Sequence, residues 1–284
     1  MLGLSRLVVL PKRVKTLPRL MIRRLAGRHL PLLAPEFPVV LLFTEKAGCT
    51  SLTKWFLFQV GKLDEATRFH PWVHRYRARV LCRQPGYRWQ ALRALALRNK
   101  PIIKLVRNPY DRAVSSFLST LNNAHPEGGK SWARDLVAAA RARAGKPPSD
   151  MPAMSFRDFL GLLAANGTGP GEADGHVARQ HVPGEDRRVD RIIRLERFVE
   201  EIRRIEAEYK LRPSPLDLIT YSRHHRSAAS NGAGVLAAGP DLEITCDQVR
   251  QKRVPAYDSL YDEETRRLVR ECFAADFEAY GYED

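Results

Sequence analysis

Short apolar runs that alternate with helix-period patterns are the clearest signal along the chain. Residues 38–43 (Pro-Val-Val-Leu-Leu-Phe) and 102–106 (Ile-Ile-Lys-Leu-Val) are typical of short buried strands. A third run, at 191–194, leads into an amphipathic segment at 196–209. The helix predicted after the first run presents one apolar face, formed by Leu52, Trp55, Phe56 and Val60. This alternation predicts the α/β class, with a central parallel sheet flanked by helices.

The loop between the first strand and its helix has the composition of an anion-binding site. It reads Thr-Glu-Lys-Ala-Gly-Cys-Thr-Ser from residue 44 to residue 51. A helix N-terminus offers free N–H groups and the positive end of the helix dipole, and Gly48 lets the backbone approach a ligand closely. Lys46 adds a charge, and Thr50 and Ser51 add hydroxyl donors. Because the lysine precedes the glycine, this is not the nucleotide-hydrolase loop, which ends in Gly-Lys-Ser/Thr.

A second candidate for anion binding follows the second strand. Asn108 is a suitable N-cap, and Pro109 and Asp111 suit the first helical turn. Arg107 is therefore expected at the carboxyl end of the strand, and Ser115 about two turns into the next helix. Open α/β sheets bind ligands at that edge. An arginine fork with a hydroxyl is suited to hold a second phosphate.

Together these two segments resemble the sulfotransferases that use 3′-phosphoadenosine 5′-phosphosulfate (PAPS), specifically the branch that contains the Golgi carbohydrate sulfotransferases. Further similar segments extend the resemblance from about Pro38 to the C-terminus: residues 155–160, 176–180, 191–196 and 276–282. The segment at 176–180 departs from the family pattern, because Val177 stands where the family has an aromatic residue.

The resemblance implies a P-loop-like three-layer sandwich and sulfuryl transfer from PAPS to a hydroxyl acceptor, with carbohydrate favoured. In the family, a loop like residues 46–51 holds the 5′-phosphosulfate, and a segment like residues 107–115 holds the 3′-phosphate. The donor-binding residues expected here are therefore Lys46, Ala47, Gly48, Cys49, Thr50, Ser51, Arg107 and Ser115. Lys46 would also stabilise the leaving oxygen, and the chemistry requires no metal.

A histidine is the expected general base for the acceptor hydroxyl. His70 and His74 lie between the two phosphate segments, where many relatives carry a catalytic histidine. His70 is the first candidate and His74 the second. His176 and His181 follow, because the His-x-x-x-Gln segment lies near the acceptor in the family. The expected catalytic set is thus Lys46 with His70, His74 or His176.

The net charge of +15 is unevenly distributed. Residues 1–35 contain eight Lys or Arg and no acid, which leaves 15 − 8 = +7 for the remainder. We therefore divide the chain into a basic N-terminal arm (1–35) and a sulfotransferase domain (36–284). Prolines break the apolar runs of the arm, so none of them reaches the roughly 20 residues that a membrane-spanning helix needs. It either docks on an anionic membrane surface, or packs on the domain or forms a loose tail. The composition suggests a bacterial cytoplasmic enzyme, which would be peripheral at the inner membrane face if the arm docks there.

Two other functions remain open from the sequence. One is a nucleotide kinase or hydrolase on the same kind of fold, which magnesium-dependent donor binding would reveal. The other is a non-enzymatic basic module for a membrane surface or nucleic acid, although no nucleic-acid motif is present. The four cysteines show no CxxC pair or Cys/His metal spacing, so no metal site is predicted and a reducing compartment is expected. Four segments are expected as surface insertions, and loops of this kind near the cofactor edge usually shape the acceptor site. They are a loop at 122–130, an Ala/Arg helix at 131–144, a loop at 166–175 and a mobile segment at 227–240.

Overall fold

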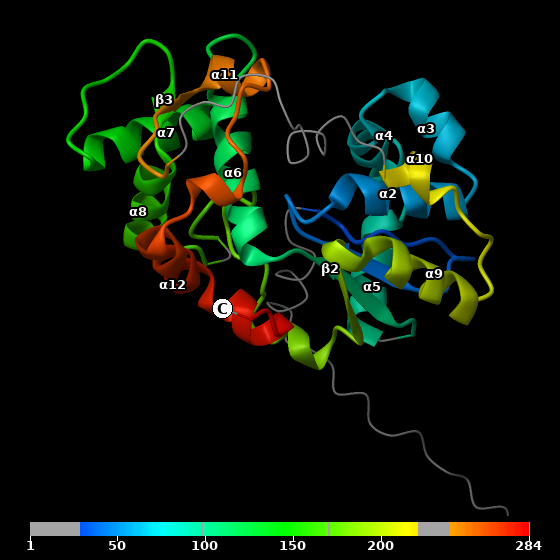
Figure 1. Cartoon of the computed structure of the whole chain (residues 1–284). Helices are drawn as coiled ribbons and strands as arrows, with labels where there is room; N and C mark the ends of the chain where they lie inside the picture. Colours follow the sequence, from blue (N-terminus) through cyan, green and yellow to red (C-terminus); the bar gives the residue numbers. More distant parts are fainter. Residues whose placement is uncertain (1–28, 98, 170, 221–238, 284) are drawn as a thin grey trace, which may run out of the picture.

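A three-stranded parallel sheet lies at the centre of one half of the molecule (Figure 1). The computed structural model describes residues 29–97, 99–169, 171–220 and 239–283. The strand order is β1 (Val40–Phe43), β2 (Ile102–Val106), β4 (Arg191–Arg194). Val40 pairs with Ile102, and Ile103 pairs with Arg191, so β2 is the middle strand. The three predicted strands and the mixed α/β class are confirmed.

The helices around this sheet share one hydrophobic core with it. Apolar residues recur along these helices at helical spacing, so each helix has one apolar face that packs towards the sheet. In α2, for example, Leu52, Trp55 and Phe56 are fully buried. The elements of this half are α2 (Cys49–Gln59), α3 (Leu63–Phe69), α4 (Val73–Arg79), η1 (Leu81–Arg83), α5 (Tyr87–Leu97), η3 (Leu195–Arg197), α9 (Phe198–Glu208) and α10 (Leu216–Thr220). The helix predicted at 196–209 corresponds to η3 and α9.

A second hydrophobic core is formed mainly by helices and lies beside the sheet half (Figure 1). Its elements are α6 (Pro109–Ala124), α7 (Ser131–Arg143), β3 (Ala153–Met154), α8 (Phe156–Asn166), β5 (Ile244–Thr245), α11 (Cys246–Arg250), η5 (Asp258–Leu260) and α12 (Glu263–Tyr280). The short strands β3 and β5 pair in antiparallel fashion.

The Ala/Arg helix predicted at 131–144 is confirmed as α7, but one of its faces is buried, which the expectation of a surface insertion did not include. Helix α7 buries Ala133, Val137 and Ala140 in the second core. The small alanine side chains make one face of this helix weakly apolar, yet they allow close packing against its neighbours. The loop expected at 122–130 begins only at His125, because α6 continues through Ala124. Of the segment 227–240, residues 227–238 lie outside the described residues.

A buried lysine ties the middle strand to the C-terminal helix. Lys104 of β2 is 2% exposed, and its Nζ donates to the Gln180 carbonyl (2.6 Å), to Glu185 Oε2 (2.6 Å) and to the Tyr280 hydroxyl (2.9 Å). A buried ammonium is tolerated only with such complete pairing. Desolvation lowers the pKa of Lys104, and the Glu185 carboxylate opposes that shift. The network anchors the segment before η2 (Glu185–Arg187), the first residue of η2 and the end of α12 to the sheet.

The described end of the predicted N-terminal arm packs on the sheet half. Leu32 and Leu33 are buried, and Leu32 forms an isolated antiparallel bridge with Leu41 of β1. Residues 1–28, which carry the basic charges of the arm, lie outside the described residues. Within the described ranges, the helices are all too short or too polar to cross a membrane.

Candidate functional site

The N-terminus of α2 is left without protein caps, as the strand–loop–helix prediction required. Gly48 is the N-cap residue, with φ 85°, and it offers no capping side chain; the first turn contains no acid. The first N–H groups of a helix have no intrahelical partner, so those of α2 remain for a ligand. A Cβ at position 48 would overlap the Leu195 side chain, and this φ favours glycine. The loop thus has the geometry that an anion cradle requires.

Lys46 and two arginines concentrate positive charge at this cradle. Lys46 has a left-handed backbone, with φ 66°. Desolvation, together with the charges of Arg107 and Arg112, lowers the pKa of Lys46 to about 8, while Cys49 acts in the opposite direction. Because desolvation and cationic neighbours disfavour the charged form of this lysine, a bound anion would stabilise that form strongly. The electrostatics therefore suit a ligand with more than one negative charge.

Buried Arg112 supports the loop from the side opposite to solvent. Its side chain is 1% exposed; Nε donates to the Glu45 carbonyl (3.1 Å) and Nη2 to the Ala178 carbonyl (2.7 Å). The sequence analysis gave this arginine no role, although it falls within the 107–115 segment. Its five donors and lasting charge allow it to hold two backbone carbonyls that belong to distant segments.

The one acid of the loop is already paired. Glu45 Oε1 lies 2.9 Å from His29 Nε2. Burial raises the pKa of Glu45, but the hydrogen bond and charge of His29 dominate and lower it to about 2. This pairing limits the repulsion that the carboxylate would exert on an anion in the cradle. The sequence carried no local signal for it, because His29 lies outside the motif.

A second buried side chain fixes the backbone of Arg107. Gln180 Oε1 accepts from the Arg107 N–H (2.9 Å), and Gln180 Nε2 donates to the Arg107 carbonyl (2.8 Å). The Gln180 N–H in turn donates to Asp276 Oδ2 (2.9 Å). Both Gln180 and Asp276 are fully buried. The Gln180 side-chain amide thus extends the hydrogen bonding of β2 by one residue. This fixes the backbone position from which the Arg107 side chain extends.

The side chain of Arg107 reaches towards the first loop. Its Nη1 donates to the Lys46 carbonyl (3.4 Å), and its Nη2 lies 3.9 Å from Asp111 Oδ2. Asn108 caps α6 by accepting from the Tyr110 N–H, and Pro109 occupies the first turn, as predicted. Ser115 is half-buried further along α6. The structure thus brings Lys46 and Arg107 together, with Asp111 nearby.

A cavity of about 690 Å³ connects the ends of the three parallel strands. Ser51 contributes from the segment after β1, Arg107 and Asp111 from the segment after β2, and residues 195–200 from the segment after β4. It therefore lies at the carboxyl edge of the sheet, where α/β folds bind their ligands. Ser51 and Arg107 of the two predicted motifs line the same space, whereas Lys46, Thr50 and Ser115 are not among its lining residues.

Two of the candidate histidines interact with groups of the first loop. His74 Nε2 lies 3.2 Å from Thr50 Oγ1. Desolvation, with the charges of Arg77 and His29, lowers the pKa of His74 to about 3, so its imidazole is neutral at pH 7. His176 Nδ1 lies 2.7 Å from Asp174 Oδ1, and its ring stacks on Trp132. Desolvation lowers the pKa of His176, although Asp174 and Glu45 oppose the shift.

The other two histidines make different contacts. His70 is the C-cap residue of α3, and its Nδ1 accepts from the Trp72 N–H (2.9 Å), two residues along the chain. His181 Nε2 lies 3.4 Å from Asp186, and its N–H donates to Asp276. Within the described residues, the contact with Thr50 singles out His74, and the electrostatic interaction with Glu45 distinguishes His176 from His70 and His181.

Comparison with known proteins agrees with these features. The model of the sulfotransferase family matches residues 32–283, which include the α2 loop, the Arg107 segment and both buried networks. Searches of curated proteins and of solved structures gave no significant match. The family match extends over most of the chain and over every element that forms the site. The chain therefore belongs to the sulfotransferase family.

Proposed function

We propose that this sulfotransferase uses PAPS as its donor and transfers the sulfuryl group to a carbohydrate hydroxyl. The observation that carries the proposal is the cavity that Ser51 and Arg107 line together at the carboxyl edge of the sheet. PAPS carries anionic groups on both its 5′ and 3′ positions, so a site for it needs two separate cationic or N–H-rich places within one cavity. A volume of about 690 Å³ is within the range of ordinary small-molecule sites.

The residues present fit such a donor. The uncapped start of α2, with Lys46, Thr50 and Ser51, would hold the 5′-phosphosulfate, and Arg107 with Ser115 would hold the 3′-phosphate. Of these residues, Ser51 and Arg107 line the cavity. The Thr44 hydroxyl is buried and has no hydrogen-bond partner among the described residues, as expected of a group reserved for a ligand. When bound, PAPS supplies a sulfuryl group already attached to a phosphate leaving group.

The chain's own contribution is placement and charge stabilisation. Lys46 and the N–H groups of residues 48–51 are fixed before the ligand arrives, because Arg112 and the Gly48 turn hold the loop. Fixed donors stabilise negative charge where it develops, without the cost of reorganising solvent. Lys46 is thus the residue that stabilises the leaving phosphate oxygen.

His176 is the general base that the geometry supports best. When Nδ1–H donates to Asp174 Oδ1, the lone pair lies on Nε2, and the carboxylate stabilises the imidazolium that forms. The lowered pKa keeps the ring neutral at pH 7. His74 is the second choice, because its Nε2 already engages Thr50 and its pKa of about 3 makes it a weak base.

Aromatic rings beside both histidines support a carbohydrate acceptor. The Trp132 ring stacks on His176 with 5.2 Å between centroids, and the Trp72 ring meets His74 at 5.4 Å. Trp72 and nearby Phe69 are about half exposed, at 50% and 48%. Rigid amphipathic rings at a binding site offer apolar faces to the C–H faces of a sugar and leave polar edges hydrated.

The test is transfer of label from PAPS labelled at sulfur to a panel of glycans and to non-sugar alcohols. We expect labelled glycan with the wild-type chain, loss of label with Lys46→Ala, and strong reduction with His176→Asn. Donor turnover that requires magnesium and moves phosphate instead of sulfate would contradict the proposal in favour of a kinase. Label found only on non-sugar acceptors would contradict the carbohydrate part alone.

A further inference from the structure

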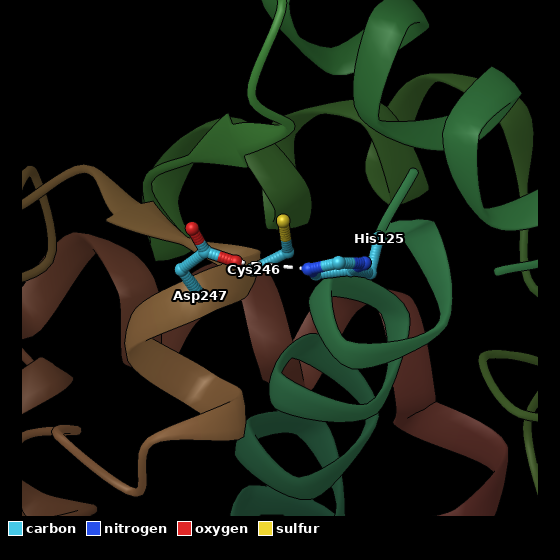
Figure 2. A group of neighbouring side chains, drawn as sticks. All are labelled: His125, Cys246 and Asp247. Atoms are coloured by element: carbon cyan, nitrogen blue, oxygen red, sulfur yellow. Dashed lines mark hydrogen bonds and ion pairs between the residues drawn. The ribbon is translucent and has the colours of Figure 1, made fainter. Parts of the chain in front are cut away.

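Three side chains that can bind a metal meet at the end of α6 that lies far from the cavity (Figure 2). His125 follows the last residue of α6, and Cys246 and Asp247 begin α11. The ligand atoms of the three residues all lie within 4.8 Å of one another. Since α6 rises about 1.5 Å per residue, its 16 residues separate the cluster from the Arg107 end of the helix by roughly 24 Å.

The burial of the three side chains describes a site that is closed on one side and open on the other. Cys246 is fully buried, the His125 side chain is 12% exposed, and the Asp247 side chain is 42% exposed. The thiol side is shielded by the second core, next to Met151, whose Sδ lies 3.1 Å from Cys246 Sγ. An ion could enter past the carboxylate and keep water on its exposed side.

We propose that His125, Cys246 and Asp247 form a binding site for a zinc-class divalent ion. Imidazole nitrogen, thiolate sulfur and carboxylate oxygen are the three ligand types that zinc takes in proteins, and three protein ligands leave the fourth position for water. A thiolate and an imidazole together favour such an ion over magnesium or calcium, which prefer oxygen ligands alone. The ligand set carries two negative charges when bound, which matches the charge of the ion.

The surroundings of His125 suit both the metal-free and the metal-bound state. With the proton on Nε2, the ring donates to Asp247 Oδ1 (2.9 Å), and Nδ1 accepts from the Glu127 N–H (3.0 Å). The Glu127 carbonyl also lies 3.3 Å from Nδ1. Moving the proton to Nδ1 would let that carbonyl accept it and would free the Nε2 lone pair for the ion. A metal-bound histidine usually donates its other N–H to such a group.

Binding releases one proton in this scheme. The Cys246 thiol loses its proton to solvent and gives up its contact with Met151, while the imidazole stays neutral and only changes tautomer. The ion would link two segments that are 121 positions apart in the sequence, since His125 and Cys246 are the nearest ligands from each. The sequence analysis predicted no metal site because it relied on short spacings between Cys and His residues. The ligands proposed here come from two distant segments that only the fold brings together.

The test uses the untagged full chain after treatment with a chelator, titrated with Co²⁺ and with Zn²⁺. We expect one ion per chain, a thiolate-to-cobalt absorption band, and release of about one proton in calorimetry across buffers of different ionisation enthalpy. Cys246→Ser should remove the band. Cys272→Ser is the matched control, since it removes a thiol that packs against the second core, outside the cluster, and should leave the band unchanged.

A second variant separates ligation from folding. Asp247→Asn can still accept the hydrogen bond from His125, so the fold should persist, whereas zinc affinity should fall at least tenfold. A wild-type chain that takes up no zinc at micromolar concentration would overturn the proposal. So would a cobalt band that survives in Cys246→Ser, or zinc affinity that is unchanged in Asp247→Asn.

Discussion

Helices α2 and α6, which both begin at the carboxyl edge of the sheet, have opposite kinds of N-terminus. Helix α2 begins at Gly48 without a capping side chain or an acid in its first turn. Helix α6 begins with Asn108 as a cap and has Asp111 in its first turn. The Asn108 N–H is itself bound by Glu196 Oε1 (2.7 Å). One helix end is thus left for a ligand, and the other is satisfied by the protein.

From this difference we propose that the two motifs bind phosphate by different means. The α2 loop would use backbone N–H groups together with Lys46, so binding there would depend on the backbone conformation of the loop. At α6 the helix end is occupied, and the anion would be met by the Arg107 side chain, whose backbone Gln180 holds. Changes at the first motif should therefore affect catalysis, whereas changes at the second should affect donor affinity and selectivity.

The largest effect is expected at the open helix end. Lys46→Ala should lower kcat by about 100- to 1000-fold, because a fixed donor to developing charge is removed. Steady-state kinetics with PAPS would measure it. Lys62→Ala is the matched control, since Lys62 forms an exposed ion pair with Glu65 and should change kcat by less than about twofold. Equal effects of the two substitutions would remove Lys46 from the site.

The next effect tests the arginine of the second motif. Arg107→Ala should weaken binding of 3′-phosphoadenosine 5′-phosphate by about 10- to 100-fold, the usual range for a lost charge-assisted hydrogen bond. Binding of adenosine 5′-phosphate should hardly change, because it has no 3′-phosphate. Calorimetric titration of both nucleotides gives the comparison. An equal loss of affinity for both nucleotides would show that Arg107 does not bind the 3′-phosphate.

The buried amide behind Arg107 should have a smaller effect of the same kind. Gln180→Leu leaves the Arg107 N–H and carbonyl without their partner, so affinity for the 3′-phosphorylated nucleotide should fall about tenfold. Selectivity over adenosine 5′-phosphate should fall with it, while kcat at saturating donor should change much less. A variant that loses thermal stability but keeps full selectivity would show that Gln180 supports the fold without positioning Arg107.

The pKa of Lys46 predicts a smaller pH effect. In the free chain this pKa is about 8, and a bound anion raises it, so binding takes up a proton above that pH. Affinity should be highest below pH 8 and should fall about fourfold between pH 7 and pH 8.5. Lys46→Arg keeps its charge over this range and should abolish the dependence. An unchanged pH profile in Lys46→Arg would contradict the assignment.

The smallest effect on binding is expected at the satisfied helix end. Asn108→Ala removes the cap of α6 and should cost about 1 kcal/mol of unfolding free energy. Nucleotide affinity should change by less than about twofold, because the α6 N–H groups are not ligands in this account. Denaturant unfolding and calorimetry on the same sample measure both. A large loss of affinity at full stability would show that this helix end also binds the donor.

Local sequence signals predicted the strands, the α2 loop and the Asn108 cap, because each depends on neighbouring residues. Contacts between distant segments were missed. Gln180 and Arg107 are 73 positions apart, and nothing in either segment specifies that a side-chain amide continues the hydrogen bonding of β2. The burial of α7 was also missed, because its alanines give little hydrophobic signal in a helix rich in arginine.

The choice among histidines depended on the same kind of information. The sequence ranked His70 before His74, and both lie between the two motifs. Only the fold shows that His74 contacts Thr50 and that Asp174 orients His176. The resemblance to a family could point to the segments that hold these residues. It could not supply the hydrogen bonds that fix a tautomer, since these depend on which side chains the chain brings together.

The most direct test of the account is calorimetric titration of the purified chain with 3′-phosphoadenosine 5′-phosphate in the presence of a chelator. Adenosine 5′-phosphate serves as the control ligand. Two anion sites in one cavity predict tight, magnesium-independent binding of the first nucleotide and binding of the second that is weaker by at least tenfold. Equal binding of both nucleotides, or binding of neither, would contradict the claim that Lys46 and Arg107 hold the two ends of one donor.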